Sequence, residues 1–207
     1  MIDKICEFIL KRMKKEMPDI TKEKEEVITY GLQLILGEIP KMLLLFGISF
    51  LLGFGWYMVF AYIAIMPYRT VSGGFHLHTH LGCIIGSSVF YYGIIIISKF
   101  LILDNLQKYI LIGLSFIFGI LMISMYAPAD TENLPIISKK ERKLKKILSY
   151  IILTITLGIA MFLKDDILSN ILIIGTIIQS LFISRIAYKI TNNKYGHEIY
   201  KDEQVQN

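Results

Sequence analysis

The residues of this chain that could carry out chemistry are concentrated between Arg69 and Cys83, where three of its four histidines and one of its two cysteines occur. A cysteine thiol is a strong nucleophile only as the thiolate, so it needs a base to take its proton and a positive environment to hold the charge. His76 and Arg69 are residues of these two types. The segment lies beside a long apolar run, and a histidine is costly to place at membrane depth. This combination predicts a thiol protease inside a membrane.

The choice of the base is limited by helix geometry. On one straight helix, His76 and Cys83 would be separated by about 10.5 Å along the axis, which is beyond hydrogen-bond reach. His76 can therefore act only from a loop that folds back over the start of the helix carrying Cys83, and Ser72-Gly73-Gly74 is a suitable hinge. His80 is the competitor, because residues three apart share a helix face at about 4.5 Å along the axis. We assign His78 to the membrane interface.

The same segment also contains four potential zinc ligands, His76, His78, His80 and Cys83. The alternate spacing of the histidines suits a strand, whereas a helix points them in different directions, and the segment has no carboxylate to orient them. A thiol site is therefore favoured, and no metal or cofactor is expected. Cys6 and Cys83 lie on segments of different character, so both are expected to be reduced.

The elements that must position these residues are membrane helices. Of the 207 residues, 54% are hydrophobic, and the mean hydropathy is +0.56. About 20 residues of helix cross a hydrocarbon core. The sequence therefore predicts an all-α integral membrane protein, a polytopic bundle forming one domain over residues 1–207, with no cleavable signal peptide. The uncharged runs are 42–66, 70–98, 109–129, 147–163 and 167–184.

Basic residues predict the orientation of the bundle. The segment up to Lys41 carries eight Lys and Arg, the loop 128–146 six, and the tail after Ser184 four. Such segments stay on the cytoplasmic side. Both termini and the catalytic site are therefore expected to face the cytoplasm, with 185–207 as a polar tail and four full crossings from Leu81 onward. These charges are explained by topology and anionic lipid, so nucleic acid is not expected as a partner.

The first apolar run, 42–66, must then begin and end on the cytoplasmic side. Gly53 and Gly55 divide it into two pieces of about 11 residues, too short to span separately a core about 30 Å thick. A re-entrant or short helical pair is the simplest arrangement. Alternatively, the first arm starts near Val27 and enters the membrane obliquely, with Glu38 and Pro40 near the interface.

Residues 1–17 have the pattern of an amphipathic helix. Apolar residues, Cys6 among them, recur at helical spacing while lysines occupy the other positions. Such a helix is expected to lie flat on the inner leaflet. Pro18 ends it, and Asp19 or Thr21 can cap the next helix.

Two motifs of this sequence resemble those of a known family. The first motif is Arg69, then Gly73-Gly74-Phe75-His76, then Cys83. The second motif is Tyr126-Ala127-Pro128-Ala129-Asp130-Thr131, ending in Leu134-Pro135-Ile136 before a basic loop. Together with the order of apolar and basic segments, they are similar over nearly the whole chain to the accessory gene regulator protein B (AgrB) family of Gram-positive quorum-sensing systems.

The resemblance implies a membrane cysteine endopeptidase. Such an enzyme cuts a small amphipathic, AgrD-like propeptide on its carboxyl side through a Cys thioester, and promotes its cyclisation to a (thio)lactone autoinducing peptide. The family's catalytic pair maps onto His76 and Cys83, which favours His76 over His80 as the base. Arg69 and Gly74, with the adjoining Gly73, match positions associated with activity.

The chain departs from the family pattern in the second motif. Members often carry basic residues there, whereas this chain has Asp130-Thr131-Glu132-Asn133-Leu134. Pairing with the substrate at this loop, and a role of Asp130 in orienting His76, are therefore open.

Three further expectations concern partners and the alternative class of function. The resemblance favours a homodimer in contact with membrane lipids, and Gly113, Gly119, Gly158 and Gly175 would permit close helix contact. Interhelical hydrogen bonds are expected of Gln179, Ser180 and Asn170. The alternative function is a peptide exporter or channel gated by the histidines, although the chain has no nucleotide-binding loop and no intramembrane acidic residues for proton coupling.

Overall fold

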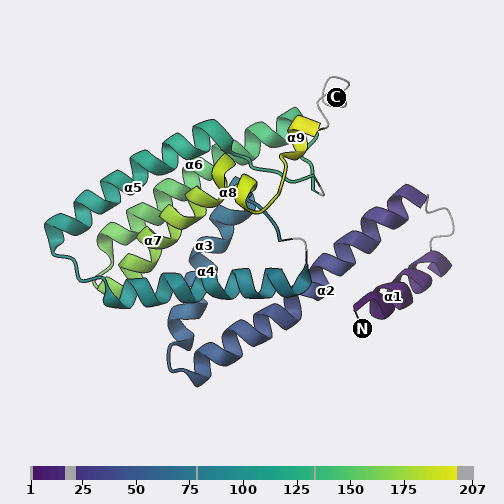
Figure 1. Cartoon of the computed structure of the whole chain (residues 1–207), viewed down its shortest axis with the longest axis horizontal. Coiled ribbons are helices and arrows are strands. Elements are labelled where there is room, and N and C mark those ends of the chain that lie inside the picture. Colours follow the sequence, from purple (N-terminus) through teal and green to yellow (C-terminus); the bar gives the residue numbers. More distant parts are fainter. Residues whose placement is uncertain (1, 17–21, 78, 133, 200–207) are drawn as a thin grey trace. The chain divides into compact units, whose positions relative to one another are not determined.

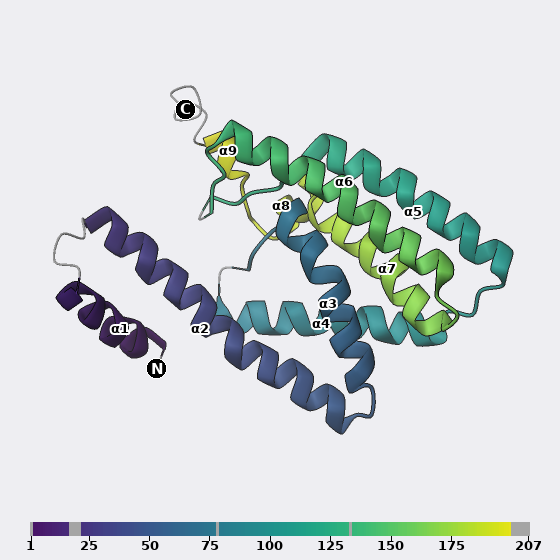
Figure 2. The same cartoon turned by 180° about the vertical axis from the view of Figure 1, so that it is seen from behind.

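Figures 1 and 2 show the computed structural model of the chain from two opposite sides. The structure describes residues 2–16, 22–77, 79–132 and 134–199. Within these ranges every regular element is a helix, with isolated backbone bridges and no strand, so the predicted all-α fold is confirmed. The helices are α1 (Ile2–Glu16), α2 (Lys22–Leu51), α3 (Gly55–Ser72), α4 (His80–Phe100), α5 (Asn105–Tyr126), α6 (Lys139–Phe162), α7 (Asp166–Phe182), α8 (Arg185–Ile190) and α9 (Gly196–Ile199).

The chain divides into two compact units, Met1–Gly55 and Trp56–Asn207. In the first unit α1 packs along α2, and the Cys6 side chain is buried. The apolar spacing at the amino terminus therefore forms the predicted helix, while its position on the inner leaflet stays a prediction. The expected helix end at Pro18 and the caps at Asp19 or Thr21 lie outside the described residues.

The first apolar run forms two helices that are longer than the predicted arms. Gly53, with φ +79°, separates α2 of 30 residues from α3 of 18 residues. The expected end of the second arm at Met66 is exceeded, because Pro67 removes only one helix hydrogen bond and α3 continues for five residues beyond it. The alternative in which the first arm starts near Val27 is the closer one, since α2 begins at Lys22.

In the second unit α5, α6 and α7 lie side by side in both views, and α4 packs against α7. Two of the glycines that were expected to permit close helix contact, Gly119 and Gly175, lie where helices approach closely. A side chain at Gly119 of α5 would collide with Leu153 of α6, and one at Gly175 of α7 would collide with Ile65 of α3. These glycines therefore serve packing within the chain, whereas a Cβ at Gly113 or Gly158 would meet nothing within 4 Å.

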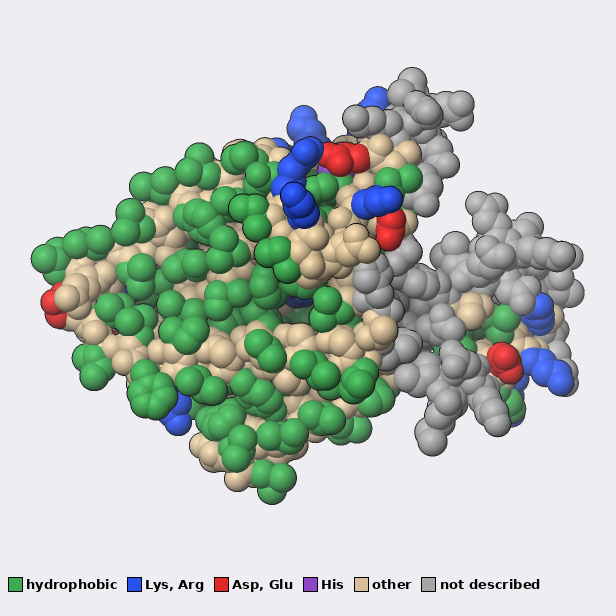
Figure 3. Space-filling view, in the orientation of Figure 1, with side chains coloured by type: hydrophobic (Ala, Val, Ile, Leu, Met, Phe, Trp, Pro, Cys, Tyr) green, Lys and Arg blue, Asp and Glu red, His purple; other side chains and the backbone are tan. Residues whose placement is uncertain are grey.

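Three helices of the described part, Leu81–Phe100, Asn105–Tyr126 and Lys139–Phe162, are long and apolar enough to cross a membrane. α7, the fourth predicted crossing, is apolar but has 17 residues, or about 25 Å of helix. Figure 3 shows hydrophobic side chains over most of the visible face of these helices, as a surface in contact with lipid requires. The chain is a membrane protein, as predicted.

The two ends of this helical unit differ. At one end the connections 101–104 and 163–165 are held by hydrogen bonds from Lys108 Nζ to the Leu163 carbonyl (2.9 Å) and from Asn170 Nδ2 to the Leu101 carbonyl (2.8 Å). At the other end lie the segment 73–77, the second motif, α8 and α9, and Lys and Arg side chains gather there (Figure 3). The residues with predicted chemistry are all at this second end or next to it.

Candidate functional site

The glycine pair forms the predicted hinge between α3 and the segment that carries His76. Gly73 and Gly74 have φ +79° and +140°, which L side chains rarely adopt. The Gly74 N–H donates to the Ala129 carbonyl (2.9 Å), and the Ala129 N–H donates to the Ser72 carbonyl (2.8 Å). A Cβ on Gly73 would collide with the Ala129 carbonyl. The first motif is therefore joined to the second by a backbone pairing that needs glycine at this position.

Cys83 lies in the first turn of α4. Thr79 caps this helix, since its hydroxyl accepts from the Gly82 N–H at 3.0 Å. The start of a helix carries a partial positive charge. The Cys83 Sγ is partly buried and lies 3.9 Å from the Leu77 carbonyl oxygen, so the thiol is directed back at the segment that carries His76. Both Cys6 and Cys83 are free, as predicted.

His76, Cys83 and Arg69 all line one cavity of about 590 Å³. His76 is exposed and stands on the non-helical segment before α4, which is where it must stand if it is the base. His80 is the first residue of α4, but its side chain, like the whole of His78, lies outside the described residues. The remaining wall is mostly apolar and is formed by Phe75, Leu77, Gly86, Ser87, Val89, Phe90, Gly93, Ile97, Ile178, Phe182 and Thr191.

Arg69 and Gln179 fasten the hinge to α7. Arg69 donates to the Gln179 Oε1 (3.2 Å) and to the Phe75 carbonyl (3.1 Å), and its guanidinium lies 5.8 Å from the centre of the Phe182 ring. The Gln179 amide in turn donates to the Gly73 carbonyl (2.8 Å). Arg69 thus adds a fixed positive charge to the cavity wall.

The predicted interhelical hydrogen bonds are confirmed. Besides Gln179, Ser180 pairs with the Tyr68 hydroxyl at 2.9 Å, and the Asn170 amide donates to carbonyls at the end of α4.

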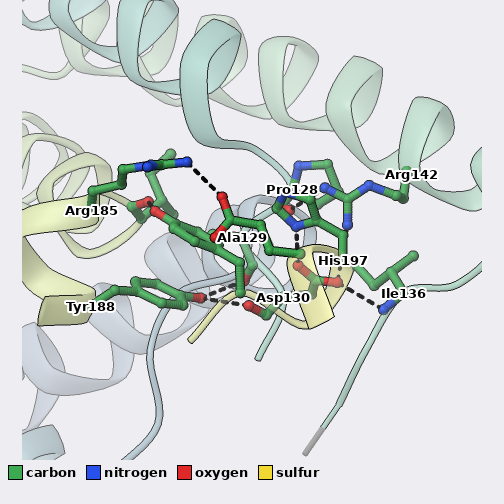
Figure 4. A network of polar contacts seen from close by, with 11 residues as sticks. Pro128, Ala129, Asp130, Ile136, Arg142, Arg185, Tyr188 and His197 are labelled. Atoms are coloured by element: carbon green, nitrogen blue, oxygen red, sulfur yellow. Dashed lines mark hydrogen bonds and ion pairs between the residues drawn. The ribbon is translucent and has the colours of Figure 1, made fainter. Parts of the chain in front are cut away.

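The second motif is built around a buried carboxylate (Figure 4). Asp130 is 4% exposed. One of its oxygens lies 2.8 Å from the His197 Nδ1, and the other lies 3.0 Å from the Arg142 guanidinium and accepts the Ile136 N–H at 3.0 Å. The histidine that Asp130 contacts is therefore His197 and not His76, for which a role of Asp130 had been left open. Asp130 is also absent from the cavity wall.

The carboxyl-terminal segment contributes residues that sequence reasoning missed. The Tyr188 hydroxyl donates to the carbonyls of Ala129 (2.9 Å) and Asp130 (3.1 Å), and its ring stacks on Tyr195 at 4.1 Å. Burial raises the pKa of Tyr188 well above its ordinary value, so the hydroxyl stays protonated and keeps donating at neutral pH. The segment expected to be a polar tail therefore supports the second motif. The presence of tyrosines in this segment was the signal available in the sequence, since aromatic residues are unusual in a solvated tail. In the structure Tyr188 and Tyr195 are buried.

The family model described as Accessory gene regulator B matches residues 6–183. The chain belongs to the AgrB family. An AgrB-like protein of Listeria welshimeri is 29% identical over 189 residues, covering 88% of this chain and 90% of that protein. AgrB-like proteins of Halalkalibacterium halodurans and Clostridium perfringens are 27% and 29% identical, covering 82% and 77% of this chain and 80% and 75% of those proteins. No solved structure matches the chain.

Membership of the AgrB family implies a part in processing the peptide of agr quorum sensing, and it implies an AgrD-like propeptide as partner. Both the first and the second motif lie inside the matched range. The segment from Ser184 to Ile199, which holds Tyr188 and His197, lies beyond it. Among the described side chains of this AgrB family member no three His, Cys, Asp or Glu gather as metal ligands, and the zinc alternative involves His78 and His80, which lie outside them.

Proposed function

We propose that this AgrB family member is a membrane-embedded cysteine endopeptidase that cuts the carboxyl-terminal part of its propeptide through a thioester on Cys83. The observation that carries the proposal is the shared cavity, because His76, Cys83 and Arg69 come from a loop and two helices and all line it. A thiol, a base and a cation around one space large enough for a peptide side chain are the parts that thiol catalysis needs.

The first step is proton transfer followed by attack. His76 accepts the proton of the Cys83 thiol, and the thiolate attacks the carbonyl carbon of the scissile bond. When the C–N bond breaks, the leaving amine takes the proton from His76 and the carbonyl carbon stays on sulfur as a thioester. The start of α4 and the Arg69 guanidinium both place positive charge beside the site of attack, where negative charge develops.

The oxyanion that forms during attack needs a hydrogen-bond donor. The N–H groups of Gly73 and Gly74 are already given to the carbonyls of Arg69 and Ala129, both at 2.9 Å. Arg69 lines the cavity and has five N–H groups, so it is a better oxyanion donor than the N–H groups of Gly73 and Gly74. Gly73 and Gly74 then act through the shape of the backbone.

The second step closes the ring. A cysteine or hydroxyl upstream in the propeptide attacks the thioester carbonyl, the C–S bond to Cys83 breaks, and a thiolactone or lactone leaves. Exchange of one thioester for another is nearly balanced in free energy, so a thiolactone needs no ATP. Water must be kept out, since hydrolysis would release a linear peptide, and the apolar wall formed by residues such as Phe75, Phe90 and Phe182 supports this exclusion.

The setting of the reaction is part of the proposal. The basic residues at the start of α6 and in α8 lie at the same end of the unit as the first motif, which supports a cytoplasmic site and cytoplasmic termini. The amphipathic propeptide would reach this end along the inner leaflet. The enzyme is proposed to act as a homodimer in contact with lipid, and Gly113 and Gly158 offer open positions for helix contact.

Cleavage by the purified full chain in liposomes tests the proposal. The expected result is that Cys83→Ala abolishes both cleavage and the covalent adduct between enzyme and propeptide, while Cys6→Ala, the matched control at the other free thiol, retains them. Iodoacetamide should inactivate the enzyme and chelators should not. Cleavage that persists in Cys83→Ala would exclude Cys83 as the nucleophile, and loss to chelators alone would leave a zinc peptidase. Absence of cleavage by the wild type would leave only peptide export.

The choice of base needs its own comparison. His76→Ala should abolish adduct formation, while His80→Ala should retain it. The opposite result, with loss in His80→Ala only, would move the base to the first residue of α4.

A further inference from the structure

The backbone of His76 is held by a side chain from the carboxyl-terminal segment. The Asn193 Nδ2 donates to the His76 carbonyl at 2.9 Å, across 117 positions of sequence. The residues 73–77 lie in no helix, so ladder hydrogen bonds do not fix this stretch as they fix α3 and α4. The loop that carries the proposed base therefore depends on contacts from other parts of the chain.

Asn193 is itself fixed before it reaches His76. Its Nδ2 also lies 3.1 Å from the Thr191 carbonyl and 3.0 Å from the Thr191 hydroxyl, and its backbone N–H donates to the Tyr188 carbonyl at 2.9 Å. Carbonyl oxygens can only accept, so the side-chain atom that faces those of His76 and Thr191 must be the NH₂ group. The contact is therefore directional, and a carboxylate in its place would repel both carbonyls.

The same segment reaches the hinge at a second point. The Ala129 carbonyl that accepts the Gly74 N–H also accepts the Tyr188 hydroxyl, both at 2.9 Å. Residues 74 and 76 are thus both secured, the first through Ala129 and the second directly, by residues of one stretch, Tyr188–Asn193. Thr191, between them, lines the cavity with His76 and Cys83.

We propose that Asn193 is a positioning residue for the reaction, which sets the place of the His76 imidazole relative to the Cys83 thiol by holding the His76 backbone. This rests on the proposed function of His76 and Cys83. It adds a residue that affects catalysis beyond residue 183, where the family match ends. Small displacements of a reacting group lower a rate steeply, so one backbone hydrogen bond has a measurable effect on catalysis.

The first measurement is propeptide cleavage by the full chain in liposomes, with Lys194→Ala as the matched control because Lys194 is adjacent and exposed. Asn193→Ala should lower kcat about tenfold, equivalent to one hydrogen bond, with KM unchanged. Asn193→Asp, which keeps the shape of the side chain, should lower kcat further than Asn193→Ala does at neutral pH. As acid protonates the introduced carboxyl group, kcat of this variant should approach that of wild type. Wild-type kcat in both variants would overturn the proposal.

The second measurement separates positioning from a general structural role. In a Cys6→Ala background, the rate of Cys83 alkylation by iodoacetamide against pH reports how strongly His76 promotes the thiolate. Asn193→Ala should slow alkylation near neutral pH as His76→Ala does, and adding Asn193→Ala to His76→Ala should change nothing further. An unchanged alkylation profile, or an equal additional loss in the double variant, would overturn the proposal.

This pair of measurements also keeps the two proposals distinguishable. If wild type does not cleave, or Cys83→Ala still does, the proposed function fails whatever Asn193 does. If wild type cleaves and Asn193→Ala matches it in kcat and alkylation, only the positioning role fails.

Discussion

The two motifs meet at one backbone pairing, between Gly73 and Ala129, yet their polar groups face different surroundings. His76, Cys83 and Arg69 of the first motif line a cavity. The carboxylate of Asp130 in the second is buried and surrounded by donors. Groups that react must face a space that a substrate can enter, whereas buried charges are tolerated when every oxygen is engaged. In the proposed function, therefore, the first motif carries the chemistry and the second supports its loop.

The contrast is sharpest for the two histidines of this end of the molecule. His76 is exposed at the cavity, and the His197 side chain is 29% exposed with its Nδ1 on Asp130. We expect His76→Ala to lower the rate of propeptide cleavage about 10²–10⁴-fold, the usual worth of a general base, without changing thermal stability. His197→Ala should instead lower stability and leave cleavage per folded molecule within a few-fold of wild type.

Single-turnover cleavage and thermal unfolding, measured on the same preparations, check this division. A loss of cleavage in His197→Ala as large as that in His76→Ala, at equal folded fraction, would show that the second motif takes part in the chemistry.

Removing the buried carboxylate should have the next largest effect. Asp130→Ala leaves Arg142, whose side chain is 19% exposed, without its counter-ion, and breaking such a pair from one side costs about 3 kcal/mol of unfolding free energy. Arg185→Ala is the matched control, because it removes an ion pair with Glu198 that is exposed and so is worth less than about 1 kcal/mol. Denaturant unfolding in detergent micelles measures both. Equal costs for the two variants would mean that Asp130 does not hold the second motif together.

Two glycines allow the hinge to be tested, because the same substitution, Gly to Ala, is expected to change the free energy of unfolding in opposite directions at the two positions. Gly73→Ala combines a φ of +79° with a collision against the Ala129 carbonyl, so it should destabilise the fold by about 1–3 kcal/mol and impair cleavage. Gly93→Ala, in the middle of α4, meets nothing within 4 Å and should stabilise by up to about 1 kcal/mol. Unfolding midpoints that move in the same direction would contradict the role assigned to the hinge.

Much of the first motif could be predicted from the sequence, because its logic is local. The seven-residue spacing of His76 and Cys83 excludes one straight helix, and a glycine pair beforehand supplies the turn, so a loop that carries His76 follows from chain geometry. The preference for His76 over His80 as the base comes from the family resemblance. The apolar runs predict α4, α5 and α6 in the same way.

The contacts of the second motif could not be predicted from the sequence, because they join residues that are far apart in the chain. Asp130 meets Arg142 from α6 and His197 from the carboxyl-terminal segment, 67 positions away, and nothing in composition or periodicity links these residues. The lengths of α2 and α3 were missed for a related reason. Prolines and glycines interrupt the apolar pattern, but packing keeps a helix intact through Pro67.

The smallest expected effect concerns the cavity, because the contrast between the two motifs depends on the first motif lining it. Gly93 lines the cavity on the face of α4 that also carries Cys83 and Gly86, and a leucine there would fill open space without a backbone clash. If propeptide side chains enter this space, Gly93→Leu should lower kcat/KM about tenfold for a propeptide with a large apolar residue beside the scissile bond, and should spare one with alanine there. Gly113→Leu is the control, because Gly113 is equally open but lies on α5 away from the cavity wall. An unchanged ratio of kcat/KM between the two propeptides would show that the substrate does not enter the cavity. The first motif would then lack the feature that distinguishes it from the second.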